Sequence, residues 1–160
     1  MSVAGIVVTS IFGSILLILI LSLFTAWIIL RRSNSHKYLS KMVEEWKKNP
    51  DPNFLCQVDS EWFHTFEQIS IQNTKNKKLN GYILTTDSDL YIIYAHGYGG
   101  NPNEKTKVLK EIQNKFKCNI LCIEQRGQLN SEMKYCTMGI NEASNLSFWI
   151  KYVVSKNENA

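Results

Sequence analysis

The sequence predicts a membrane-spanning helix followed by an α/β domain, and three observations indicate this fold class. The stretch from Val3 to Leu30 contains no charged residue. From Phe66 onward, short apolar stretches typical of strands alternate with longer stretches of helical periodicity. One apolar stretch, residues 90–95, runs directly into the sequence His-Gly-Tyr-Gly-Gly. Glycines at the end of a strand let the backbone turn sharply and bring its amides close to a ligand.

The apolar run is longer than the roughly 20 residues that a helix needs to cross a bilayer. A signal peptide would carry basic residues before a shorter apolar core, whereas here Arg31 and Arg32 follow the run. A buried core helix is the other alternative, but no polar residues mark a side that faces water. We therefore predict a single transmembrane anchor over residues 1–32.

Basic residues concentrate directly after the predicted anchor, at Arg31, Arg32, Lys37, Lys41, Lys47 and Lys48. Basic flanks tend to stay in the cytoplasm, so we expect the chain from Arg31 onward to be cytoplasmic. The formal net charge of the 160 residues is +4, and much of it lies in this flank. The flank suits a lipid bilayer with anionic headgroups. The remaining lysines are scattered among acidic residues, so we expect no nucleic-acid partner.

The four cysteines, Cys56, Cys118, Cys122 and Cys136, have no Cys-x-x-Cys spacing. They indicate neither a zinc site nor a disulfide framework. We therefore expect no metal and no cofactor.

Residues 33–60 are predicted to form a juxtamembrane amphipathic helix and a linker. The helix spans residues 36–49, and Pro50 and Pro52 end it. Its apolar face consists of Leu39, Met42, Val43 and Trp46. This face is expected to pack on the domain or on the bilayer surface rather than to bind a ligand.

Residues 61–160 are predicted to form the α/β domain. Its strands are expected over residues 66–71, 79–85, 90–95 and 119–123. One helix is expected to begin at Asn101, as the cap, and Pro102, and a second to span residues 140–154. Their apolar faces consist of Val108, Leu109, Ile112 and Phe116 in the first helix, and of Leu146, Trp149, Ile150 and Val153 in the second. The alternation predicts a parallel sheet, with strand 90–95 covered on both faces.

The motifs of this domain resemble those of the α/β-hydrolase superfamily, particularly its bacterial membrane-anchored esterase-like or lipase-like members. That group has a strand ending in His-Gly-Tyr, then a helix, then a strand ending in Asp-x-Arg-Gly-His-Gly-x-Ser-Glu-Gly. Here the second motif is Glu-Gln-Arg-Gly-Gln-Leu-Asn-Ser-Glu over residues 124–132, followed by Thr-Met-Gly at 137–139. The resemblance covers roughly Phe66 to Ala160. An N-terminal span ahead of it also suits the group, so we expect an N-terminal transmembrane helix followed by an incomplete α/β-hydrolase sheet with flanking helices.

The resemblance also implies roles for single residues. Tyr98 would donate an amide to an oxyanion hole, and Gly97, Gly99 and Gly100 would shape the turn; an ordinary turn is the alternative. His96 would be a structural residue, because the histidine of the triad comes later in this fold. Structural roles also fall to Arg126, Gly127 and Glu142, of which Arg126 and Glu142 would tie loops together.

Four residues depart from the family pattern. Glu124 replaces an Asp, Gln128 a His, Leu129 a Gly, and Asn145 an Asp. Leu129 is strained if the family glycine has a positive φ. These changes suggest a site that is no longer held to a catalytic geometry.

The sequence contains no Gly-x-Ser-x-Gly motif, and His36, His64 and His96 have no evident serine or cysteine partner. We therefore assign no catalytic residue. We expect the N-terminal part of a serine hydrolase of the carboxylic-ester type, inactive alone and completed by a downstream polypeptide. Without that polypeptide, strand 90–95 would have an unpaired edge. The alternative is a non-catalytic, membrane-tethered α/β interaction module.

Overall fold

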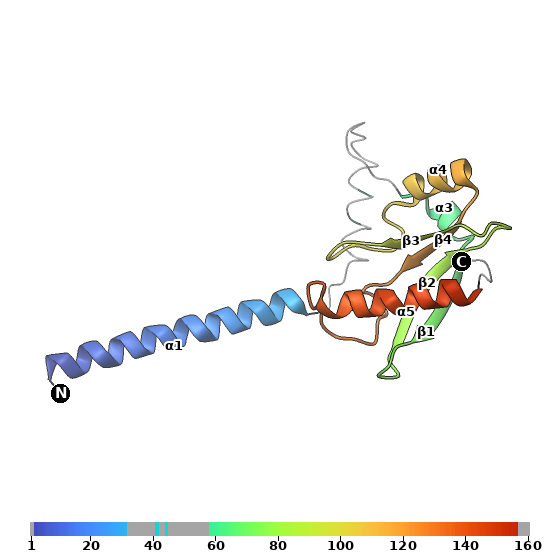
Figure 1. Ribbon diagram of the computed structural model, residues 1–160. Coiled ribbons are helices and arrows are strands. Elements are labelled where there is room, and N and C mark those ends of the chain that lie inside the picture. The colour runs from blue at the N-terminus through green and yellow to red at the C-terminus, as the bar shows by residue number, and fades with distance from the viewer. Residues whose placement is uncertain (1, 32–40, 42–43, 45–57, 157–160) are drawn as a thin grey trace. The chain divides into compact units, whose positions relative to one another are not determined.

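The computed structural model describes residues 2–31, 41, 44 and 58–156 (Figure 1). The chain forms two compact units, Met1–Arg31 and Arg32–Ala160, and each is described by itself. Of the predicted juxtamembrane helix, only residues 41 and 44 are among the described residues, and both are helical. The rest of that helix and all four residues of its predicted apolar face, Leu39, Met42, Val43 and Trp46, lie outside the described residues, so the helix stays a prediction.

The first unit is helix α1, Val3–Leu30, which is long and apolar enough to cross a membrane. The side chain of Ser2 caps its first turn by accepting a hydrogen bond from the Gly5 N–H at 3.2 Å. Hydroxyl groups inside the helix are also satisfied: Ser10 and Ser14 donate to backbone carbonyls one turn earlier, each at 2.9 Å. Polar groups paired within their own helix are compatible with a hydrocarbon environment.

The second unit contains a four-stranded sheet in the order β1-β2-β4-β3. The strands are β1 (Glu67–Gln72), β2 (Lys78–Leu84), β3 (Tyr91–Ala95) and β4 (Asn119–Ile123). Their positions match the four predicted strands. The prediction of a parallel sheet was wrong, because β1–β2 and β2–β4 pair antiparallel and only β3–β4 is parallel. A tight turn joins β1 to β2, which forces an antiparallel pair, whereas a helical crossover joins β3 to β4.

The strand at the centre of the core is β4, in which all five residues are buried. In β3, four residues are partly buried and Ala95 is exposed. Tyr91 and Ile93 pack against the core on the α5 side, and Ile92 and Tyr94 pack against the core on the other side, so strand 90–95 is covered on both faces, as predicted, but only in part. Within residues 58–156, β3 pairs with β4 alone and forms one edge of the sheet.

Helices α4 (Thr106–Phe116) and α5 (Ile140–Lys156) lie on opposite faces of the sheet (Figure 1). On the α5 face, the fully buried Trp149 packs with Leu121 and its neighbours. A Cβ on Gly81 of β2 would lie 3.0 Å from the Trp149 ring, so the glycine lets the indole approach the strand. On the α4 face, Leu109 packs against Cys118, Ile120 and Cys122.

The predicted start and inner faces of the helices need correction. Asn101 caps a separate turn, in which its N–H donates to the Glu104 carboxylate at 3.2 Å and its own Oδ1 accepts from the Asn103 N–H at 3.3 Å. Helix α4 therefore begins at Thr106 rather than at Pro102. Three residues assigned to inner faces are exposed: Val108, Phe116 and Ile150.

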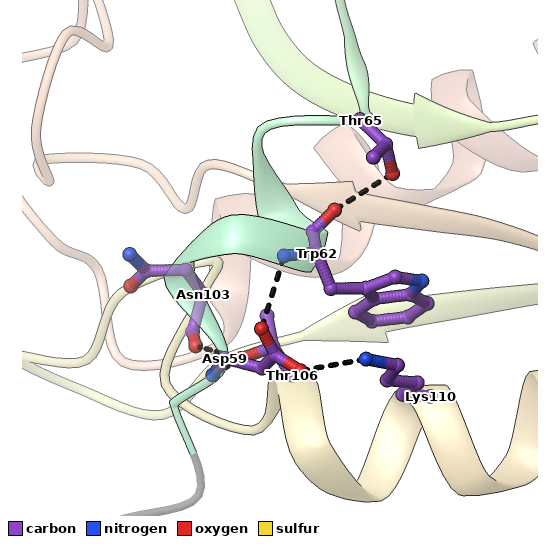
Figure 2. Close-up of polar contacts among 6 residues, drawn as sticks. All are labelled: Asp59, Trp62, Thr65, Asn103, Thr106 and Lys110. Atoms are coloured by element: carbon purple, nitrogen blue, oxygen red, sulfur yellow. Dashed lines mark hydrogen bonds and ion pairs between the residues drawn. The ribbon is translucent and has the colours of Figure 1, made fainter.

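A short helix, α3 (Ser60–Phe63), joins the start of the described domain to α4. Asp59 caps α3 by accepting from the Trp62 N–H at 3.0 Å, and its other oxygen lies 2.8 Å from the Lys110 ammonium (Figure 2). The backbone N–H of Asp59 donates to the Thr106 hydroxyl. The hydrogen bond from Lys110 is the main reason why the pKa of Asp59 is lowered.

Candidate functional site at the ends of β3 and β4

The glycine-rich segment after β3 forms a tight turn. The Gly100 N–H donates to the Gly97 carbonyl at 3.0 Å, and Gly99 has a φ of +70°. A positive φ at the third position of the turn is typical of a type II turn, which favours glycine there. The turn displays Tyr98 at its corner, with a side chain that is 53% exposed.

His96 connects the end of β3 to the end of β4. Its ring is 3% exposed, with Nδ1 2.9 Å from the Gly97 carbonyl oxygen and Nε2 3.2 Å from the Gln125 backbone nitrogen. A neutral ring with its proton on Nδ1 satisfies both contacts, because Nε2 then accepts from the Gln125 N–H. Burial lowers the pKa of His96, which favours this neutral form.

The loop after β4 folds back closely on the segment that leads to α5. Gly127 has a φ of +70°, and a Cβ there would lie 2.5 Å from the backbone nitrogen of Cys136. Beside it, the Arg126 Nε–H donates to the Tyr135 carbonyl at 3.0 Å. The segment around residue 127 therefore packs closely on the segment around residue 135. Gly127 leaves room for this approach, and Arg126 forms a hydrogen bond across it.

Glu142, in the first turn of α5, forms hydrogen bonds with the residues that precede the helix. Its carboxylate accepts from the Thr137 N–H and hydroxyl, each at 2.7 Å, and from the Gly139 N–H at 2.9 Å. Burial raises the pKa of Glu142, but these hydrogen bonds outweigh burial, and the net pKa is lowered. Glu142 is therefore ionised and holds the preceding loop as a charged hydrogen-bond acceptor.

Glu124 is 4% exposed and lies in a polar network beneath the loop. Its Oε1 accepts from the Tyr82 hydroxyl at 3.1 Å, and its Oε2 accepts from the Asn80 side chain and the Asn130 N–H, each at 3.2 Å. Burial and the nearby Glu124 carboxylate raise the pKa of Tyr82 to about 12. Asn80 and Tyr82 were not predicted from the sequence; the available signal was an asparagine within a largely apolar predicted strand.

Two of the residues that depart from the family pattern are energetically unfavourable, Leu129 in its backbone conformation and Gln128 in its hydrogen bonding. Leu129 has a φ of +42°, a region that a side chain with a β-carbon rarely adopts. Gln128 is 1% exposed, and its Oε1 has no hydrogen-bond partner among the described residues. Both features cost free energy.

A cavity of about 300 Å³ lies where these elements meet. Five of its lining residues are candidates from the sequence: His96, Gly97, Tyr98, Arg126 and Glu142. The remaining candidates, Gly99, Gly100 and Gly127, are not among the lining residues. The other five lining residues are Gln125, Gln128, Cys136, Met138 and Gly139.

The chemistry of the cavity is limited by the side chains that line it. No serine or threonine is among them, and the one thiol belongs to Cys136. Burial raises the pKa of Cys136, so the thiol stays protonated at neutral pH. Among the described residues, no group of three or more His, Cys, Asp or Glu side chains is placed to hold a metal ion.

Comparison with known proteins finds no matching family model and no matching curated protein. Solved structures do match, among them three crystal forms of the Pyrococcus furiosus esterase Pf2001. Their TM-scores are 0.53, 0.54 and 0.51, with 23%, 24% and 22% sequence identity. The matches cover 65%, 61% and 61% of this chain and 41%, 40% and 37% of the esterase. The chain thus spans about two fifths of the esterase, and the likeness shows an esterase-like fold.

Proposed function

We propose that this chain is the N-terminal part of a membrane-anchored serine hydrolase of the carboxylic-ester type, and that it has no activity alone. The observation that carries the proposal is the turn over residues 96–100, which follows β3 and borders the cavity. The likeness of the fold to an esterase supports the same reaction class. The chain spans about two fifths of that esterase, which supports a site that further polypeptide completes.

In the proposed site, the turn stabilises the oxyanion of an acyl-transfer intermediate. The Tyr98 N–H is the proposed donor, and Gly97 and Gly99 give the turn the shape that directs it. Amides aimed at a developing oxyanion stabilise such an intermediate by a few kcal/mol. The nucleophile, the acid and the histidine of the triad come from the completing polypeptide.

The described side chains around the cavity do not replace the triad. The cavity is lined by no serine, and the Cys136 thiol is protonated. Both ring nitrogens of His96 are engaged by backbone groups, at 2.9 and 3.2 Å. A general base needs a nitrogen that is free to take the proton of the nucleophile.

The proposed surroundings of the chain are a lipid bilayer and a downstream polypeptide. Helix α1 crosses the bilayer once, and the basic flank after Leu30 keeps the domain in the cytoplasm. The downstream polypeptide adds a strand to β3, which pairs with β4 alone among the described strands. An unpaired strand edge offers N–H and C=O groups to such a partner.

A non-catalytic, membrane-tethered interaction module is the second candidate. The positive φ of Leu129 favours it, because an active hydrolase would be expected to keep glycine at a strained position of this loop.

A fluorophosphonate probe distinguishes the two candidates. The full chain should be expressed in membranes, alone and together with the coding region immediately downstream. We expect no labelled serine in the chain alone, and one labelled serine in the downstream polypeptide when both are present. A labelled serine within residues 1–160 would contradict inactivity of the chain alone. Failure of both samples to react, with the two polypeptides associated, would favour the interaction module.

A further inference from the structure

Positive charge is distributed unevenly over the folded domain. Between Glu104 and Lys117, the sequence contains five lysines and two glutamates, a balance of +3. The other residues between 58 and 156 include seven basic and eight acidic side chains, a balance of −1. The basic surface of this domain is therefore concentrated on α4 and its ends.

Apolar side chains are exposed beside these lysines. Phe116 is 53% exposed and Val108 is 36% exposed. Helical spacing places them on one flank of α4 with the partly buried Ile112. Four lysines of this region are exposed: Lys105, Lys107, Lys115 and Lys117. A helix with exposed lysines and exposed apolar residues is typical of a surface that binds anionic lipid headgroups.

The first residues of the described domain contact this same helix. Asp59 lies one residue after the start of the described domain and contacts α4 at two places: its carboxylate binds Lys110 at 2.8 Å, and its N–H donates to the Thr106 hydroxyl (Figure 2). Only 26 residues, 32–57, separate Arg31 from Val58. A linker of this length would keep the whole domain within reach of the bilayer, and the charge of α4 would then decide which face of the domain meets it.

We infer that the α4 surface formed by Lys105, Lys107, Val108, Lys115, Phe116 and Lys117 rests on an anionic bilayer, the one that α1 spans. The inference rests on the proposed anchoring by α1. The lysine ammonium groups attract lipid phosphates, and the exposed Phe116 ring enters the headgroup layer. Glu111 is the one acidic side chain within α4 and weakens this attraction without cancelling it.

Lysine acetylation of the full chain in single-copy nanodiscs tests this inference. One set of discs contains phosphatidylcholine alone, and the other contains about one third phosphatidylglycerol. Mass spectrometry gives the acetylation rate of each lysine. We expect the rates of Lys105, Lys107, Lys115 and Lys117 to fall several-fold in the anionic discs and to recover in about 0.5 M NaCl, where charge is screened. Lys75 and Lys77, in the β1–β2 turn, are the internal controls and should not change.

A matched pair of triple variants distinguishes contact of the α4 surface with the bilayer from a general attraction of the basic chain to anionic lipid. One variant combines Lys107→Glu, Lys115→Glu and Lys117→Glu, and the other combines Lys75→Glu, Lys77→Glu and Lys78→Glu. We expect the first to abolish the protection of Lys105 and the second to preserve it. Equal loss in both variants, or equal protection in neutral and anionic discs, would overturn the inference. Resistance of the chain to carbonate extraction is a separate measure of anchoring by α1. If the chain resists extraction but its α4 lysines are not protected, the inference about α4 is refuted and the anchoring stands. If carbonate releases the chain, the anchoring on which the inference rests is refuted.

Discussion

The Nε2 atom of His96 accepts a hydrogen bond of 3.2 Å from the backbone N–H of Gln125, and this contact joins the ends of the parallel strands β3 and β4. The Nδ1 side of the same ring binds the Gly97 carbonyl oxygen. One buried neutral imidazole therefore fixes both the glycine turn and the start of the loop that follows β4. Protonation of Nε2 would remove its acceptor and break the contact with Gln125.

This arrangement predicts a loss of stability at mildly acidic pH. Burial lowers the pKa of His96 below 6.5 in the folded chain, so the unfolded chain takes up the proton first as the pH falls. The stability is fully present above about pH 6.5 and is lost as the pH falls from there toward the folded pKa. Urea unfolding in detergent, followed by fluorescence of the buried Trp149, should show a lower midpoint at pH 5.5 than at pH 8. The variant His96→Asn keeps His36 and His64 and should lack this part of the pH dependence.

Two glycines of the site should differ in how well they tolerate an added methyl group. A Cβ at Gly127 would lie 2.5 Å from a backbone nitrogen, whereas a Cβ at Gly97 would have no atom within 4 Å. We expect Gly127→Ala to destabilise the chain by about 3 kcal/mol or more, and Gly97→Ala to change its stability by less than about 0.5 kcal/mol. The denaturation midpoints of the two variants measure this difference. Equal midpoints would show that the loop after β4 relaxes around the new methyl group.

The positive φ of Leu129 predicts a stabilising substitution. Leu129→Gly should raise the free energy of unfolding by up to about 1 kcal/mol, because relief of the left-handed conformation outweighs the greater freedom of glycine in the unfolded chain. Leu129→Val should lower it, since a β-branched side chain is worse there. A stabilising Leu129→Val would contradict the strain at this position.

The edge of β3 predicts self-association of the isolated soluble part. We expect residues 31–160 to be poorly folded or oligomeric by size-exclusion chromatography with light scattering, because an apolar strand edge recruits another strand. Co-expression with a downstream polypeptide that carries further strands should yield a defined complex. A monodisperse monomer with one cooperative melting transition would instead support the self-sufficient interaction module.

The basic flank after Leu30 predicts the membrane orientation. A fluorescent reporter that matures in the cytoplasm should be active when fused after Ala160, and alkaline phosphatase at the same position should be inactive. Active alkaline phosphatase would show that the domain lies outside. Moving Arg31 and Arg32 to the amino terminus should reverse the membrane orientation, so that alkaline phosphatase becomes active and the fluorescent reporter inactive.

The sequence predicted the local elements well, because strands and helices depend on patterns among near neighbours. All four strands, helix α1 and the two long helices of the domain lie within a few residues of their expected places, apart from the start of α4. Asn101 does act as a cap, as its residue type predicts, but of a separate turn that Glu104 closes. Helix α4 begins after that turn, and its N-cap residue Lys105 makes no side-chain cap hydrogen bond, so no residue type in the sequence marks this helix start.

Long-range relationships were less predictable. A continuous apolar run indicates burial but does not say which of two such strands is central: residues 90–95 and 119–123 both fit a buried strand, and only β4 is fully buried. The antiparallel pairing of β2 with β4 depends on a partner far along the chain. In the candidate site, family motifs identified Arg126 and Glu142, whereas Gln125 and Met138 line the cavity only because of how the loops fold.

The pairing of β2 with β4 has a consequence for how the chain is made. Gly81 lies opposite Ile123 in that pair, so β2 leaves the ribosome well before its central neighbour exists. Until then, the β1–β2 hairpin has one open side, and isolated hairpins are only marginally stable. Helix α1 emerges still earlier and is apolar enough to engage a membrane during synthesis. Until β4 is synthesised, the β1–β2 hairpin is therefore expected to be an aggregation-prone intermediate. A chaperone would matter most between the synthesis of β2 and that of β4.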